Sequence, residues 1–123
     1  MFDHDRLEVY AVARQFNREV KELLTELPRG QAESRNNLRR AAMSVTRNIA
    51  EGSGKWQICD KVNFYHIARA SATECASSLD ELVDFELVPE ERVIRLREFL
   101  SRIVAMLTAM IRSVEARAGP GMK

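Results

Sequence analysis

VIRLREFLSRIVAMLTAMIRSV, residues 93–114, is the stretch that decides the fold. Apolar side chains recur along it at every third or fourth position: Val93, Leu96, Leu100, Ile103, Leu107, Met110 and Val114. This spacing matches the turn of an α-helix and gathers the apolar side chains into one stripe. We place the start of this helix at Val88, with Pro89 in its first turn and Glu90 and Glu91 beside its positive end.

Three earlier segments show the same periodicity, so the chain is expected to form four helices. The first spans residues 5–27, with the stripe Val9, Ala13, Phe16, Val20, Leu23 and Leu27. The second spans residues 32–51, with the stripe Leu38, Ala42, Val45 and Ile49. The third spans residues 60–85, with the stripe Phe64, Ile67 or Ala68, Ser71, Cys75, Leu79 and Leu82. Small side chains in the second and third stripes predict that these helices pack closely.

Capping and turn residues stand at the expected helix ends. Asp3 or Asp5 can cap the first helix, and Asp60 can cap the third. Gly52 stands where a helix commonly ends on a residue of positive φ. Together with Gly54 it is expected to permit a tight turn.

The four segments predict an all-α fold. No segment alternates with the period of two that is typical of a strand. Four amphipathic helices with short connections bury their stripes most simply as an antiparallel up-down-up-down four-helix bundle. The 123 residues suit a single domain, which we place at residues 1–117, with a flexible tail at 118–123.

Composition excludes several classes of protein. Apolar residues make up 46% of the chain and charged residues 30%, which is typical of soluble globular proteins. No apolar run approaches the roughly 20 residues that span a bilayer, and the N-terminus does not resemble a signal peptide. We therefore expect a cytoplasmic protein with no membrane partner. Cys59, Cys75, His4 and His66 do not have zinc-site spacing, so we expect two reduced, partly buried thiols.

Motifs for catalysis or for cofactor binding are missing from the sequence. The Glu-x-x-His pattern of di-iron bundles does not occur, since Asn63 stands three residues before His66. The Gly52–Lys55 segment lacks the length of a phosphate-binding loop and the strand that precedes one. We therefore predict that the protein is not an enzyme and has no metal, cofactor or small-molecule substrate.

The formal net charge is only +1, but the charges are unevenly placed. Basic side chains fall opposite the apolar stripes of the first two helices and in the loop after them: Arg14, Arg18, Lys21, Arg35, Arg39, Arg40, Arg47 and Lys55. Residues 70–91, by contrast, hold seven acids and no lysine or arginine. Three interpretations stay open: solvated faces with pairs such as Arg18–Glu22, a surface for RNA phosphates, or two faces that meet between copies in a ring.

Trp56 follows Lys55 in the same loop, and it also allows two interpretations. It could be a platform on which a nucleic-acid base stacks. It could instead cover the end of a helix, and we favour this second role.

Two motifs carry a resemblance to a known family. LRRAAMSVTRNIAEGSGK at residues 38–55 and FYHIARASATE at residues 64–74 resemble the bacterial four-helix bundle proteins encoded in intervening sequences of 23S ribosomal RNA genes. That family includes the accessory variability protein of diversity-generating retroelements. The resemblance implies a homopentamer without known catalysis and, for the retroelement branch, binding to RNA and to a reverse transcriptase. The nearly neutral charge makes this chain more similar to the intervening-sequence branch.

We interpret the motifs as a signature of fold and assembly. Their characteristic polar and glycine positions are Asn48, Glu51, Gly52, Gly54, Ser71 and Glu74. Buried or half-buried polar groups need partners, so Glu51 or Glu74 is expected to pair with Arg40 or Arg69, across helices or across subunits. The sequence thus predicts a non-catalytic homo-oligomeric scaffold, with an RNA-binding accessory factor of a reverse transcriptase as the alternative.

Overall fold

The structure of the protein is a computed structural model, which describes residues 1–118. Four helices account for most of these residues: α1 (Glu8–Thr25), α2 (Ala32–Ser53), α3 (Ile58–Asp84) and α4 (Ile94–Ala118). Two short 3₁₀ helices, η1 (Asp3–Arg6) and η2 (Glu90–Arg92), precede α1 and α4. Residues 1–118 contain no strand. Of the tail predicted at 118–123, residues 119–123 lie outside the described part of the chain.

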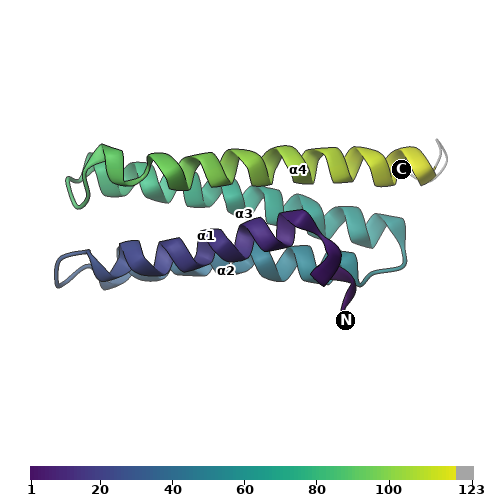
Figure 1. Ribbon diagram of the computed structural model, residues 1–123, viewed down its shortest axis with the longest axis horizontal. Helices are drawn as coiled ribbons and strands as arrows, with labels where there is room; N and C mark the ends of the chain where they lie inside the picture. Colours follow the sequence, from purple (N-terminus) through teal and green to yellow (C-terminus); the bar gives the residue numbers. More distant parts are fainter. Residues whose placement is uncertain (119–123) are drawn as a thin grey trace.

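The helices run alternately up and down, which confirms the predicted four-helix bundle (Figure 1). The α1–α2 and α3–α4 connections lie at one end of the bundle, and the α2–α3 loop lies at the other with the start of the chain. Each helix packs against the helices before and after it, and α1 also packs against α4. The closest packing is between α2 and α3, and α1 lies much less closely against α2.

The predicted stripes form the core. All six stripe residues of α1 and its C-terminal flank are buried, as are all four of α2. In α3, Tyr65 is buried whereas Phe64 is half-buried, and of the two alternatives Ala68 is buried while Ile67 is 39% exposed. In α4, the stripe is buried except at Met110, which is half-buried next to the buried Ile111. Periodicity therefore identified the inner face of every helix, with shifts of one residue near two helix ends.

The predicted caps of α1 and α3 are wrong. Leu7, with extended backbone, precedes α1, and its side chain makes no capping hydrogen bond. Asp5 serves η1 instead, because its Oδ2 accepts a hydrogen bond from the Phe2 backbone N–H at 2.8 Å. Gln57 precedes α3, which places Asp60 inside the first turn. A carboxylate there still interacts favourably with the positive end of the helix.

The fourth helix begins later than the predicted start at Val88. Pro89 precedes η2, and α4 itself begins at Ile94. Val88 and Val93 are both buried, so the segment between them is attached to the core at its two ends. This arrangement explains why an apolar pattern that starts at Val88 does not continue one regular helix.

Ion pairs fasten α1 and the residue after it to α4 and η2 along the outside of the bundle. Arg95 donates hydrogen bonds to both carboxylate oxygens of Glu19, with Nε–Oε1 at 2.8 Å and Nη2–Oε2 at 3.1 Å. Arg92 pairs in the same way with Glu26. The hydrogen bonds from Arg95 lower the pKa of Glu19 below its usual value, although partial burial opposes this shift.

The Glu19 pair predicts a dependence of stability on pH. A glutamate in an unfolded chain has a pKa of about 4.3, and the folded value of Glu19 is lower. Its ion pair therefore stabilises the fold above that pH, and this contribution is lost as pH falls through the folded pKa. We expect Glu19→Gln to flatten the loss of unfolding free energy between about pH 5 and pH 3, as measured by urea denaturation.

The matched control for this prediction is Glu22→Gln. Glu22 is an exposed carboxylate on the same helix, and it joins none of the ion pairs within residues 1–118. Its replacement should leave the slope unchanged. Equal slopes for both variants and the parent would contradict the role given to Glu19.

Two further predictions about side chains and membranes can be compared with the fold. Cys59 is exposed and Cys75 is fully buried, so the expectation of partial burial is wrong for both thiols. Burial raises the pKa of the Cys75 thiol to about 12.

None of the helices within residues 1–118 has the length and hydropathy that crossing a membrane requires.

Candidate functional site

The predicted basic side chains lie on the outside of α1 and α2 and divide into three groups. One group lines a groove between these helices: Lys21, Arg35 and Arg39. A second group lines a hollow near the C-terminal end of α2: Arg47 and Lys55. The third group is exposed on α1 or α2 and lines neither: Arg14, Arg18 and Arg40. The structure therefore does not gather them into one continuous site.

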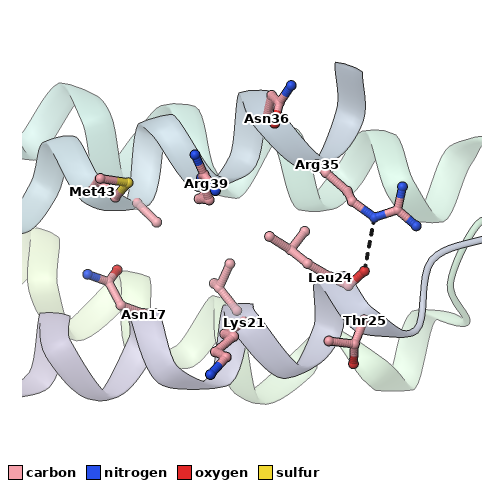
Figure 2. A pocket seen from close by; sticks show the side chains of 10 residues that line it. Asn17, Lys21, Leu24, Thr25, Arg35, Asn36, Arg39 and Met43 are labelled. Carbon is pink, nitrogen blue, oxygen red and sulfur yellow. Dashed lines mark hydrogen bonds between the residues drawn. The ribbon is translucent and has the colours of Figure 1, made fainter. Parts of the chain in front are cut away.

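The α1–α2 groove has a volume of about 450 Å³ and runs along residues 17–25 of α1 and 35–43 of α2. Its apolar lining comes from Val20, Leu24, Ala42 and Met43. Figure 2 shows Leu24 reaching from α1 toward α2, with Met43 on the facing helix. The groove lies along the α1–α2 junction, where the contact is less extensive than at the α2–α3 junction.

Positive charge at the groove is not balanced by acids. No aspartate or glutamate is among the described residues that line it. Neither Lys21 nor Arg39 takes part in the ion pairs formed within residues 1–118. The groove therefore combines an apolar floor with uncompensated positive charge.

Arg35 has a structural role that the sequence did not reveal. Its guanidinium donates to three backbone carbonyls: Leu24 in the last turn of α1, from Nε at 3.2 Å, and Leu27 and Pro28 in the loop that follows, from Nη2 at 2.9 and 3.0 Å. The bond to Leu24 is drawn in Figure 2. The last carbonyls of a helix have no partners within it and carry partial negative charge, so a cation is favourable there. Arg35 thus ties the start of α2 to the end of α1.

Asn17 is a lining residue that the sequence analysis missed. Its Nδ2 donates to Thr46 Oγ1 at 3.4 Å, whereas its buried Oδ1 accepts no hydrogen bond from residues 1–118. Asn17, Lys21 and Leu24 are spaced by four and three, which forms a second stripe beside the apolar one. That second stripe is the signal that could have located the groove.

The motif residue Ser71 joins α3 to α2, and the motif residue Asn48 holds its partner Ser44 in place from within α2. Ser44 and Ser71 share a hydrogen bond between their hydroxyl oxygens at 2.7 Å. Asn48 Nδ2 donates to the backbone carbonyl of Ser44 at 2.8 Å and to its Oγ at 3.0 Å. Ser71 is 9% exposed, so the expectation that it needs a partner is confirmed, and Ser44 is the partner that the sequence did not identify.

The two motif glycines differ from their predicted roles. Gly52 lies inside α2, and the cap residue Gly54 has a φ of −84°, so neither uses the positive φ that a tight turn would require. A Cβ on Gly52 would lie 2.7 Å from Cε1 of the buried Tyr65, which leaves no room for a side chain. Gly52 therefore permits close approach of α3.

Lys61 completes the α2–α3 junction. Its Nζ donates to the backbone carbonyls of Gly52 and Ser53, at 2.8 and 3.0 Å. This contact repeats at the end of α2 what Arg35 does at the end of α1. Burial lowers the pKa of Lys61 below its usual value.

The predicted pairing of the motif acids does not occur within the described chain. Glu51, Glu74, Arg40 and Arg69 are all exposed, and none joins the ion pairs of residues 1–118. Because water solvates these charges well, the fold does not need such a pair. Pairing between subunits stays a prediction.

Trp56 does not cover a helix end. It is 95% exposed, so the favoured interpretation is wrong. Lys55, its neighbour, lies over the ring of Phe64 with Nζ 5.3 Å from the ring centroid. The loop therefore presents a large aromatic side chain to solvent next to a lysine that is itself packed on α3.

Acidic residues gather on the opposite pair of helices, around what we call the acidic turn: Glu81, Asp84, Phe85, Glu86, Glu90 and Glu91. All of these residues are exposed, and Phe85 is 76% exposed. Asp80, just before the turn, pairs with Arg97 of α4, so the acidity of this region is partly offset by the fold. None of the five carboxylates in the turn joins an ion pair within residues 1–118.

A specific backbone motif shapes the acidic turn. The Glu86 N–H donates to Val83 O at 2.9 Å, and the Leu87 N–H donates to Leu82 O at 2.9 Å. These are the two bonds of a Schellman ending, in which the residue after the cap adopts positive φ. Glu86 occupies that position with a φ of 57°, where glycine is usual. The turn thereby holds Phe85 in a defined place.

Within residues 1–118 no group of histidine, cysteine, aspartate and glutamate side chains has the arrangement of a metal site. The described surface thus offers a basic groove, an exposed tryptophan and an acidic turn.

Comparison with known proteins gives a family and a fold. A family model described as "23S rRNA-intervening sequence protein" matches residues 5–109. Similar solved structures include a crystal structure of a protein of unknown function from the S23 ribosomal protein family of Bacteroides thetaiotaomicron VPI-5482. It is 23% identical, has a TM-score of 0.77 and covers 84% of this chain and 97% of its own, so the likeness shows the fold alone. No curated protein is significantly similar to this chain.

Proposed function

Because the chain belongs to the family of 23S rRNA-intervening sequence proteins, we propose that it is a non-catalytic homo-oligomeric scaffold acting through contacts with protein or RNA. We place it in the cytoplasm. Five subunits are the number that the sequence resemblance implies.

One observation carries the proposal: a basic groove and an acidic turn lie on opposite pairs of helices. The α1–α2 groove is lined by basic side chains without acids, and the acidic turn between α3 and α4 has five unpaired carboxylates. Such a molecule attracts copies of itself head to tail, because the faces that meet carry complementary charge. Contacts of this kind close into rings when the rotation between subunits permits it.

The mass of the native particle tests the scaffold. At about 10 µM and low salt, we expect light scattering to give one discrete species whose mass is a multiple of the 14.1 kDa chain. Raising the salt toward 1 M shortens the screening length to about 3 Å, so the particle should weaken. A monomer at micromolar concentration under both conditions would rule the scaffold out.

A second function, RNA binding as an accessory factor of a reverse transcriptase, is favoured by Trp56. Its ring is 95% exposed, and Arg47 and Lys55 line a hollow near it in the chain. Aromatic side chains of this kind stack on unpaired bases, each worth about 1–3 kcal/mol. Titration of fluorescently labelled single-stranded RNA measures the affinity. The logarithm of the binding constant should fall with the logarithm of the salt concentration with a slope of about −3 to −6, and Trp56→Ala and Arg47→Glu should each bind more weakly.

Arg14→Glu is the matched control for RNA binding. Arg14 is exposed but lies outside the hollow, so its reversal should change the affinity much less than the reversal of Arg47. Salt-independent binding, or equal losses for both reversals, would exclude this hollow as the RNA site. A neighbouring reverse-transcriptase gene would separately favour the accessory role.

A further inference from the structure

The α1–α2 groove and the acidic turn are complementary in charge, and each also presents apolar surface. The groove has an apolar floor formed by Leu24 and Met43, with Lys21 and Arg39 among its polar lining. The acidic turn carries Phe85, an apolar ring that is 76% exposed, between Asp84 and Glu86. The Phe85 ring with its flanking carboxylates is therefore complementary to an apolar groove with flanking cations.

The dimensions of the groove suit an aromatic side chain with its flanking groups. Its volume of about 450 Å³ lies in the range of roughly 300–1,000 Å³ typical of specific binding pockets. Exposed aromatic side chains that enter such pockets are often the residues that dominate an interface. Asn17 Oδ1, buried at the groove without a donor from residues 1–118, can also accept a hydrogen bond from an occupant.

The acidic turn is already organised for docking. Its two Schellman hydrogen bonds fix the backbone on either side of Phe85. Val88 and Val93, which are buried, attach the rest of the connection to the core. A preorganised loop loses little conformational entropy when it binds, which favours affinity.

The positions of the two features restrict the symmetry. Both lie toward the end of the bundle that carries the α1–α2 and α3–α4 connections (Figure 1). They belong to different helix pairs, α1–α2 and α3–α4, so a contact between them joins two different surfaces of the chain. Rotation about an axis parallel to the helices keeps all features at the same level and brings the turn of one copy to the groove of the next. The contact is therefore head to tail.

We propose that the α1–α2 groove receives Phe85 from the acidic turn of a second copy of this chain, with Lys21 and Arg39 facing its carboxylates. This inference rests on the proposed homo-oligomer and names the contact that builds it. Loss of the contact separates subunits and leaves each bundle folded, since Phe85 contributes little to its own core.

Cysteine cross-linking tests the geometry directly. Two chains are prepared in a Cys59→Ser background, one with Asn36→Cys at the groove and one with Asp84→Cys beside Phe85. Mixed and mildly oxidised, they should form a disulfide-linked heterodimer that survives denaturing electrophoresis. Asn36→Cys mixed with Asp60→Cys is the control, because Asp60 lies at the other end of the bundle and should not cross-link.

Substitutions test the energetics of the same contact. Phe85→Ala should raise the subunit dissociation constant at least about tenfold, with unchanged helix content by circular dichroism. Arg39→Glu should act in the same direction, whereas Arg14→Glu, outside the groove, should leave the particle intact.

The outcomes separate this inference from the scaffold itself. An oligomer that gives no Asn36–Asp84 cross-link, or that ignores Phe85→Ala, overturns the groove contact while the scaffold stands. A parent protein that is monomeric overturns both proposals together.

Discussion

Replacing Gly52 with valine is expected to lower the free energy of unfolding by about 3 kcal/mol, and with alanine by about 1–2 kcal/mol. A Cβ at this position would lie 2.7 and 2.8 Å from two ring carbons of Tyr65 and 3.1 Å from Cβ of Phe64. Tyr65 is only 3% exposed, so its ring cannot simply move into solvent. The two helices must separate, and this costs packing along their whole contact. For alanine, the better helix propensity, about 1 kcal/mol, offsets part of the loss.

The neighbouring glycine provides the control. A Cβ on Gly54 would meet only backbone oxygens at 3.7 and 3.8 Å, and its φ of −84° suits any residue. Gly54→Ala should therefore change stability by no more than about 0.5 kcal/mol, or raise it slightly. Urea denaturation followed by circular dichroism measures both variants. If Gly52→Val were as stable as Gly54→Ala, the close α2–α3 packing described here would be wrong.

Replacing Arg35 with methionine is expected to cost about 2 kcal/mol of unfolding free energy. The substitution keeps most of the apolar stem but removes three hydrogen bonds from a charged group to carbonyls of Leu24, Leu27 and Pro28. The Leu24 carbonyl lies in the last turn of α1, at the negative end of the helix, where the loss of a cation is also unfavourable. Lysine should restore only part of the stability, since it cannot reproduce the planar fork of donors.

Arg39→Met is the matched control for Arg35. Arg39 is one turn further along α2, lines the same groove, and is exposed. Its replacement should change the free energy of unfolding by less than about 0.5 kcal/mol. Equal effects of the two substitutions would contradict the clamp assigned to Arg35. Tests of RNA binding by charge reversal should accordingly use Arg47 and leave Arg35 in place.

Periodicity predicted most of the fold because burial in a bundle depends on direction around each helix. Leu96, Leu100 and Ile103 are buried because their spacing of four and three places them on one face of α4. Ser71 is buried with the apolar residues of its stripe on α3. Adjacent aromatic residues are harder to assign: Phe64 and Tyr65 differ by only 100° around α3, and the sequence favoured the wrong one for full burial.

The candidate site was less predictable, because it depends on distances between helices. No pattern within α2 alone shows that Gly52 faces Tyr65 or that Arg35 reaches the end of α1. The charge pattern correctly placed basic residues outside α1 and α2, but it could not show which of them share a groove. Trp56 shows the same limit, since its exposure depends on where the loop leaves α2.

The hydrogen bond between the Ser44 and Ser71 hydroxyls affects how α2 and α3 are aligned along their axes. Both helices bury small side chains, such as Ala42 in α2 and Ala72 in α3, and Gly52 lies close against Tyr65. A slide of one helix past the other by a full turn would leave the buried Ser71 hydroxyl without Ser44, a loss of about 1–3 kcal/mol, whereas Ser44 Oγ would keep its hydrogen bond from Asn48 on the same helix. The 2.7 Å hydrogen bond between Ser44 and Ser71 therefore helps to fix the axial offset of α2 relative to α3. A surface that combines residues of the α1–α2 pair with residues of the α3–α4 pair therefore depends on this hydrogen bond for its alignment.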